Sequence, residues 1–156
     1  MLSPILLTNN PRFQDLSLTG MDITFIPAAV IRAARDLIHK GWLLANHPLY
    51  GNFLPHQMPY RSLALTPRVR SGEHPAGIDP TSLLLIERAQ ARYYDVDPAR
   101  MPASLSVREM QDCAFVDVEL LRATIESLGG SIESISNPNG SGMAYPPGLL
   151  PDHKEM

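Results

Sequence analysis

The chain has 156 residues, a length that fits one domain built around one hydrophobic core. Hydrophobic residues make up 44% of the sequence and charged residues 19%, a balance that indicates a globular protein and not a disordered one. Thirteen basic residues against sixteen acidic ones give a net charge of −3, which argues against a broad basic surface for nucleic acid or anionic lipid.

The expected location is the cytoplasm. Cys113 is the only cysteine, so an intrachain disulfide and a cysteine-rich zinc site are both excluded, and a reducing compartment is favoured. Residues 1–10 lack the basic start and the sustained apolar run of a secretory signal. No later stretch approaches the roughly 20 apolar residues that span a bilayer. We therefore expect neither a membrane partner nor a nucleic-acid partner, and the oligomeric state stays open.

Two short strands are predicted near the N-terminus. Residues 5–8 form an apolar run that is closed by two asparagines and a proline, which suits a buried strand followed by a turn. Residues 21–26 alternate and are rich in branched and aromatic side chains, which predicts a second strand. A brief helical turn is expected between them, at residues 13–16.

A helix and two more strands follow. Residues 28–40 carry strong helix formers, with Pro27 at the first helical position and Gly41 as the stop. Residues 42–45 and 60–66 are predicted as the third and fourth strands. The irregular residues 46–59 between them contain three prolines, one glycine and two histidines. We expect a long ordered loop, a feature that is often functional.

The second half of the chain is predicted to be helical. Residues 67–78 are a solvated connection, and Asp79 and Pro80 then start a helix that runs to about residue 94. Ser106 and Glu109 have the form of a capping box, and apolar residues recur at helical spacing up to residue 128. This pattern fits one long helix, or two helices with Asp117 capping the second. The α/β domain covers residues 1–130, and residues 131–156 form a loosely ordered tail rich in proline and glycine.

The order of these elements predicts an α/β fold, with a small wound, mainly parallel sheet of about four strands flanked by helices. Ligands of such folds bind beyond the carboxyl ends of the strands. The residues at that edge would be Asn9 and Asn10, then Asn46 and His47, and Thr66 after the fourth strand. We expect a polar pocket there, although the two asparagines can instead serve only to form a turn.

The residues around the fourth strand supply further candidates. Arg61 and Lys40 can each pair with a carboxylate or a phosphate, although Lys40 can equally pair with Asp36 on its own helix. Ser62 and His47 would form a minimal nucleophile and base, but no nucleophile-elbow glycines surround the serine, so catalytic residues stay unknown. The candidate ligand-binding residues are Asn9, Asn10, His47, Tyr60, Arg61 and Ser62.

Known metal and cofactor motifs are missing from the sequence. The histidines show neither a zinc-binding spacing nor an H-E-x-x-H pattern, so we read them as ordinary loop or surface residues and expect no metal. No glycine-rich nucleotide-phosphate motif occurs, so we expect no cofactor.

Several short motifs resemble one family. The runs DLIHKG at residues 36–41, HPLYGN at 47–52 and PYRS at 59–62, with Pro55 between them, resemble the GrdX family. Its members are small proteins of uncertain role, typically encoded with components of glycine, sarcosine or betaine reductase. The opening TNNP and the run VDVELL at residues 116–121 extend the resemblance to about residue 128.

The resemblance implies a cytoplasmic, non-catalytic accessory protein of anaerobic amino-acid reduction, with reductase components or a small polar ligand as partners. It transfers no catalytic residue. Residues 67–78 and the tail after Gly130 depart from the family pattern. The alternative function is a small-molecule-binding protein or an enzyme that uses the polar pocket at the edge of the sheet.

Overall fold

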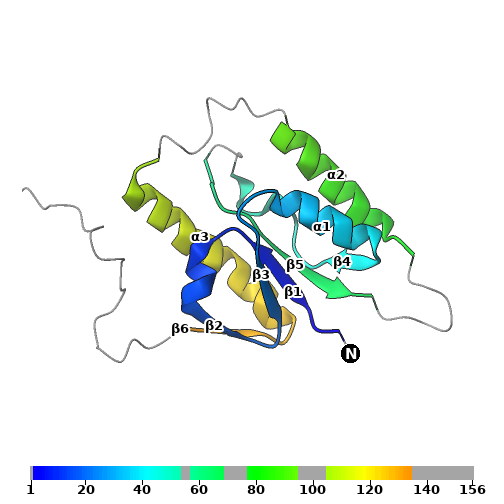
Figure 1. The fold of residues 1–156 in the computed structure, drawn as a ribbon, viewed down its shortest axis with the longest axis horizontal. Coiled ribbons are helices and arrows are strands. Elements are labelled where there is room, and N and C mark those ends of the chain that lie inside the picture. The colour runs from blue at the N-terminus through cyan, green and yellow to red at the C-terminus, as the bar shows by residue number, and fades with distance from the viewer. Residues whose placement is uncertain (1, 54–56, 69–76, 95–104, 135–156) are drawn as a thin grey trace, which may run out of the picture.

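The computed structural model describes residues 2–53, 57–68, 77–94 and 105–134 (Figure 1). In chain order its elements are β1 (Ile5–Thr8), the 3₁₀ turn η1 (Pro11–Asp15), β2 (Leu16–Thr19), β3 (Asp22–Phe25), α1 (Val30–His39), β4 (Trp42–Leu44), the 3₁₀ turn η2 (Tyr50–Asn52), β5 (Ser62–Pro67), α2 (Pro80–Tyr94), α3 (Val107–Ser127) and β6 (Ser131–Ser134). None of the described helices combines the length and the apolar character needed to cross a membrane.

The main sheet has four strands in the order β3-β1-β5-β4. The α/β class is confirmed, but the prediction of a mainly parallel sheet is wrong. Only β1 and β3 pair in parallel, whereas β5 is antiparallel to both β1 and β4. A parallel pairing of β4 with β5 would need a crossover that returns the chain to the opposite end of the sheet. The described part of the β4–β5 connection contains only the short turn η2, and β5 enters where β4 leaves.

In this topology three strands end at the same edge of the sheet, which we name the carboxyl edge. Because β5 is antiparallel to both neighbours, β1, β3 and β4 all run in the same direction. Their carboxyl ends therefore meet the start of β5, next to Asn9, Asn46 and Arg61. Thr66, which was predicted at this edge, pairs with Leu43 near the start of β4 and lies at the opposite end of the sheet.

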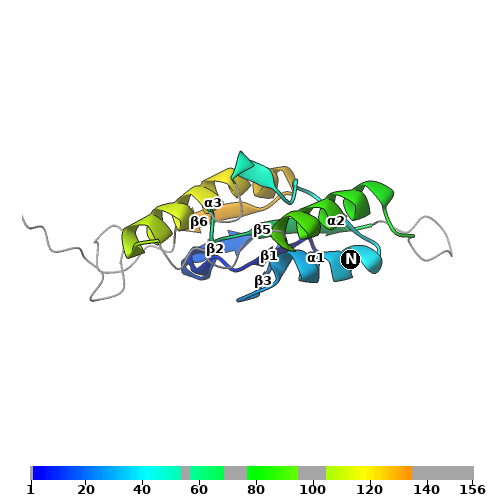
Figure 2. The ribbon, with the colours of Figure 1, turned by 90° about the horizontal axis from the view of Figure 1, so that it is seen from above.

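Alternating side chains of the central strands build two separate cores. Leu7, Leu63 and Leu65 belong to a buried cluster with residues of α1 and α2. Leu6 and Ala64 point to the other face and join a second cluster with residues of α3. Figures 1 and 2 accordingly show α1 and α2 together on one side of β1 and β5, with α3 on the other side.

A second sheet, made of β2 and β6, was not predicted. The two strands pair antiparallel from Leu16 opposite Ser134 to Thr19 opposite Ser131, beside α3. The sequence had placed residues 131–134 in the loose tail. Each strand has only four residues, and its apolar side chains become partly buried only when the distant partner and α3 are present. Residues 135–156 of the predicted tail lie outside the described part of the chain.

The helix starts agree with their sequence signals in two of three cases. Ser82 N donates to Asp79 Oδ2 over 2.8 Å at the start of α2. Glu109 N donates to Ser106 Oγ, and Ser106 N donates back to Glu109 Oε2, which forms the expected capping box of α3. By contrast, α1 begins only at Val30, because Ala29 adopts a left-handed conformation with φ of 63°.

The long apolar stripe of the second half forms the single helix α3, so the two-helix alternative is wrong. Asp117 lies in the middle of this helix and does not cap one. The helix ends where Gly129 takes a φ of 82°, and the N–H of Gly130 returns to the carbonyl of Ile125 over 2.9 Å.

Candidate functional site

A buried carboxylate at the carboxyl edge gathers donors from three parts of the chain. Asp117 of α3 is fully buried. Its Oδ2 accepts hydrogen bonds from Asn10 Nδ2 over 2.9 Å and from Ser62 Oγ over 2.7 Å. Its Oδ1 accepts a hydrogen bond from the hydroxyl of Tyr50. A buried carboxylate needs such donors because it has lost its contact with water.

The donors around Asp117 are also bonded to each other and to the backbone. The hydroxyls of Thr8 and Ser62 lie 2.7 Å apart, and Ser62 N donates to the Tyr50 hydroxyl over 2.7 Å. Asn10 Nδ2 also donates to the carbonyl of Ala114 over 2.9 Å. These bonds, which we name the Asp117 network, tie β1, β5 and α3 to the segment that follows β4.

Arg61 lies on the other face of the sheet, between two aromatic rings. Its guanidinium carbon is 4.7 Å from the ring centre of Tyr50 and 5.6 Å from that of Tyr93. Nε donates to the Tyr93 hydroxyl over 2.8 Å, and Nη1 donates to the carbonyl of Tyr50 over 3.3 Å. The residue is only 3% exposed, yet Nη2 has no hydrogen-bond partner among the described residues.

Two asparagine side chains hold the ends of the strands together. Asn9 Oδ1 accepts a hydrogen bond from Arg61 N over 2.7 Å, and Asn9 Nδ2 donates to the carbonyl of Pro59 over 3.1 Å. Asn46 bridges two residues of β5, because its Nδ2 donates to the Ser62 carbonyl and its Oδ1 accepts from Ala64 N. Both amides therefore act on the backbone of the carboxyl edge.

The two tyrosines that contact Arg61 are held in the protonated form. Burial raises the pKa of Tyr50 well above its ordinary value, and the negative charge of Asp117 raises it further, while Arg61 opposes this shift. Burial also raises the pKa of Tyr93, again against the opposing effect of Arg61. At neutral pH both phenols are therefore neutral hydrogen-bonding groups and not nucleophiles or bases.

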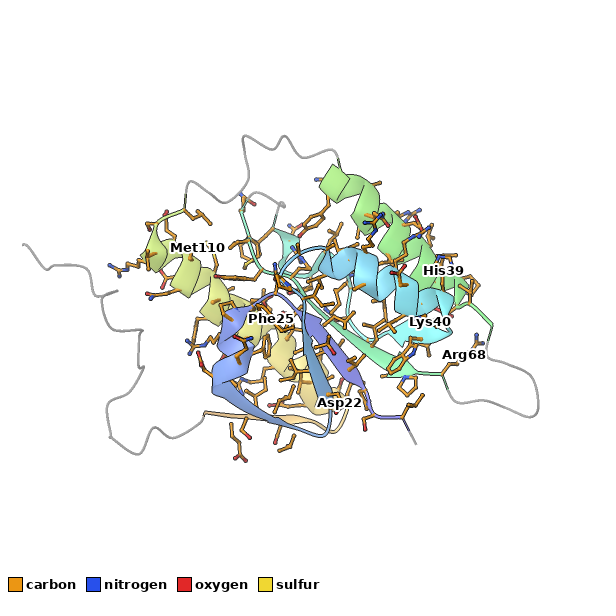
Figure 3. The ribbon with its side chains drawn as sticks, viewed as in Figure 1. Asp22, Phe25, His39, Lys40, Arg68 and Met110 are labelled. Atoms are coloured by element: carbon orange, nitrogen blue, oxygen red, sulfur yellow. The ribbon has the colours of Figure 1, made fainter. Side chains whose placement is uncertain are left out.

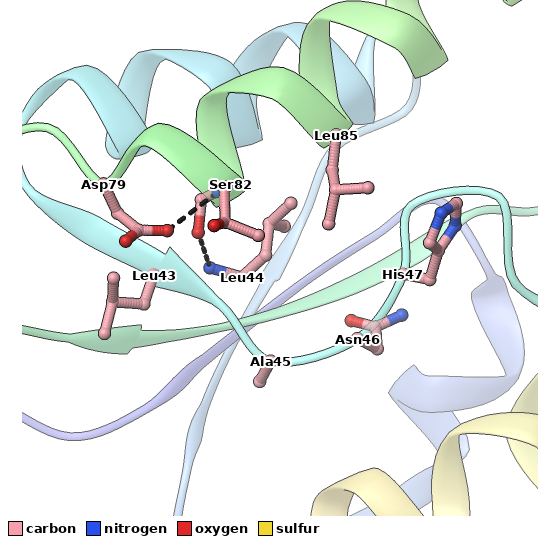
Figure 4. A pocket seen from close by; sticks show the side chains of 9 residues that line it. Leu43, Leu44, Ala45, Asn46, His47, Asp79, Ser82 and Leu85 are labelled. Carbon is pink, nitrogen blue, oxygen red and sulfur yellow. Dashed lines mark hydrogen bonds between the residues drawn. The ribbon is translucent and has the colours of Figure 1, made fainter.

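His47 lies at the same edge but outside the Asp117 network. Its side chain is exposed, and its Nδ1 accepts a hydrogen bond from Leu49 N over 3.0 Å. Ser62 Oγ is instead bonded to Thr8 and Asp117, so the nucleophile and base pair with His47 that was considered from the sequence is not formed. His47 lines a pocket of about 390 Å³ between β4 and the start of α2 (Figure 4). Its other polar lining residues are Asn46, Asp79, Thr81 and Ser82.

Tyr60 and Cys113 lie on the α3 side of the edge. The thiol of Cys113 donates to the carbonyl of Gln57 over 3.9 Å. Burial is the main cause that raises the pKa of Tyr60, and Cys113 and Asp117 add to it. Burial also raises the pKa of Cys113, and the nearby acidic residues add to this effect. This environment disfavours the reactive thiolate.

The remaining candidates lie elsewhere. Figure 3 places Lys40 beside Arg68 at one end of the molecule, away from Phe25, which ends β3 at the carboxyl edge. Lys40 therefore cannot share a ligand with Arg61. Among the residues that the structure describes, no group of three or more metal-ligating side chains comes together. His56 and His74, which the sequence indicates to be ordinary loop or surface residues, lie outside the described ranges.

The structure brings together four of the six candidate ligand-binding residues, Asn9, Asn10, Arg61 and Ser62, but divides them between two faces of the sheet. Sequence reasoning missed Asp117, Tyr50 and Tyr93. A signal for Asp117 exists, because it falls on the apolar stripe of α3, three residues after Ala114 and four before Leu121. A carboxylate in such a position needs buried donors.

Comparison with known proteins assigns the chain to a family. No curated protein and no solved structure matches the chain. The model of the family described as GrdX-like protein matches residues 5–126, which include every element from β1 through most of α3. The match also includes the Asp117 network and Arg61. The chain therefore belongs to the GrdX-like protein family.

Proposed function

We propose that the chain is a non-catalytic accessory protein that docks onto a component of an amino-acid reductase, of the glycine, sarcosine or betaine type, in the cytoplasm. The main support for this proposal is that Tyr50, in the segment after β4, is fixed by buried contacts while its neighbours are exposed. Tyr50 is fixed at both ends of its side chain, by Asp117 and Ser62 at the hydroxyl and by Arg61 against the ring. The neighbouring side chains of His47 and Asn52 are exposed.

A segment that is fixed from inside and exposed outside suits protein recognition, because little conformational entropy is lost when a partner binds. The Asp117 network also supports a non-catalytic role. Its hydroxyls and amides bond to each other, and Ser62 has a carboxylate and a hydroxyl as partners instead of an imidazole. The family name supports the reductase setting.

The test is direct binding of the full chain to purified reductase components, measured by biolayer interferometry. We expect saturable binding to one component and a loss of at least fivefold in affinity for His47→Ala. His39→Ala is the matched control, because His39 is also exposed but lies at the far end of α1. Absence of binding to every component, together with turnover by the isolated chain, would refute the accessory role.

A second function, binding of a small polar ligand at the carboxyl edge, is supported by a specific observation. Arg61 is buried and keeps a donor nitrogen without a partner among the described residues. Thermal-shift screening with amino acids, betaine, acyl phosphates and nucleotides tests this function. A reproducible rise in Tm with one compound class supports it, and a flat response to all classes rejects it.

A further inference from the structure

Arg61 places a positive charge inside the protein, and no described acid forms a salt bridge with it, because the buried Asp117 bonds to the hydroxyl of Tyr50 and not to the guanidinium. The salt bridges among the described residues join Arg35 to Glu87 and Arg122 to Glu119, and neither involves Arg61. Burial of a cation costs several kcal/mol in lost hydration, so buried arginines are normally paired with an acid. The two tyrosine rings compensate part of this cost through cation–π contacts.

The unused hydrogen-bond donors of Arg61 have a defined shape. A guanidinium carries five N–H groups, and here Nε uses one for Tyr93 and Nη1 uses one for the carbonyl of Tyr50. Among the described residues, the two N–H groups of Nη2 have no partner, and Nη1 uses one of its two N–H groups. One N–H from each of two adjacent nitrogens forms the fork that matches the two oxygens of a carboxylate.

We propose that Arg61 binds the carboxylate group of a small anionic ligand at the carboxyl edge of the sheet, an inference that rests on the second proposed function. A carboxylate adds one negative charge beside the guanidinium. A phosphate dianion would add two, in a buried region where Asp117 already supplies a negative charge and where burial makes further charge expensive. The ligand class is therefore a small monocarboxylate, and the rings of Tyr50 and Tyr93 are the walls that contact it.

Two neighbouring features favour an anion at this place. α1 begins at the same edge and on the same face of the sheet as Arg61, and Ala29 provides no side-chain cap for its free N–H groups. The positive end of this helix adds to the potential that attracts an anion. Tyr93 is the penultimate residue of α2, so the site lies beside the carboxyl end of that helix.

The test uses acetate as the probe and the full chain as the sample. Acetate replaces chloride at constant ionic strength, and Tm is followed by differential scanning fluorimetry. We expect a saturable rise in Tm with acetate and a smaller rise with inorganic phosphate at the same ionic strength. Nuclear Overhauser effects from the acetate methyl group to the ring protons of Tyr50 and Tyr93 locate the site without any substitution.

Arg61→Lys keeps the charge but removes the fork, so the apparent affinity for acetate should fall at least tenfold. Arg32→Lys makes the same chemical change at an exposed residue of α1 and should leave the affinity unchanged. Should Arg61→Lys fail to fold, the Overhauser contacts of the wild-type chain decide. The inference is overturned by a Tm that does not respond to acetate, by an equal response of folded Arg61→Lys, or by acetate contacts that exclude both rings.

The outcomes separate this inference from the function on which it rests. A rise in Tm with a compound that lacks a carboxylate, together with no response to acetate, rejects the carboxylate site and keeps ligand binding. A flat response to every compound rejects both.

Discussion

Removal of the Asp117 carboxylate should cost a large part of the stability of this fold. Asp117→Ala deletes three hydrogen bonds, from Asn10, Ser62 and Tyr50. Hydrogen bonds to a charged group contribute about 1.5–3 kcal/mol each, which gives roughly 5–9 kcal/mol before the cost of burying the carboxylate is subtracted. That cost is several kcal/mol, so the free energy of unfolding should fall by about 3–5 kcal/mol. Small domains are stable by about 5–15 kcal/mol in total.

The loss should come mainly from two donors that lose their acceptor. After Asp117→Ala, one N–H of Asn10 Nδ2 still donates to the carbonyl of Ala114, and the Ser62 hydroxyl still has Thr8. The second N–H of Asn10 Nδ2 and the Tyr50 hydroxyl are left in the protein interior without the acceptor that Asp117 provided. Asp117→Asn keeps the size of the side chain and one acceptor oxygen, so we expect a smaller loss of about 1–3 kcal/mol.

Urea denaturation, followed by circular dichroism and by the fluorescence of the single tryptophan, Trp42, measures these differences. Asp112→Ala is the control, because Asp112 is exposed on the same helix and should change the free energy of unfolding by no more than about 0.5 kcal/mol. If Asp117→Ala and Asp112→Ala were equally stable, the Asp117 network would contribute no net stability, and the reasoning would be refuted.

Three further predictions test other parts of the fold. The raised pKa values of Tyr50 and Tyr93 contribute stability that is fully present below about pH 10 and is lost as the pH rises through their folded-state pKa values. The urea midpoint of unfolding should therefore fall as the pH rises above about 10. A urea midpoint that does not change with pH there would contradict this prediction. Gly20→Ala should cost about 1–3 kcal/mol, because φ is +80° and a Cβ would lie 2.6 Å from a backbone carbonyl oxygen. Gly77→Ala, which meets no atom within 4 Å, is its control in thermal melts. Ser106→Ala removes the α3 capping box and should cost about 1 kcal/mol in urea denaturation; an unchanged midpoint would show that the cap is replaceable.

The split of the candidate site between two faces separates its two roles. On the α3 face, Asp117 and its donors satisfy each other and fix the carboxyl edge. On the other face, Arg61 lies beside Tyr93, and its Nη2 has no partner in the part of the chain that the structure describes. Tyr50 contacts residues of both faces, since its hydroxyl donates to Asp117 and its ring packs against the guanidinium of Arg61. Substitution of Tyr50 would therefore change both faces, and only Arg61 and Tyr93 test the ligand site alone.

The sequence by itself determined the features that neighbouring residues encode. The apolar run of β1, the Asp79 and Pro80 start of α2 and the capping box at Ser106 depend on contacts within a few residues, and all three occur as predicted. The family motifs also identified the chain without any structure.

Tertiary structure alone decided the direction of β5, the pairing of β2 with β6 and the partners of Asp117. Each depends on residues that are distant in sequence, such as Asn10 and Asp117, and no local propensity encodes which distant strand or donor will be nearest. The carboxyl edge still gathered Asn9 and Arg61, because an inserted antiparallel strand begins where its neighbours end.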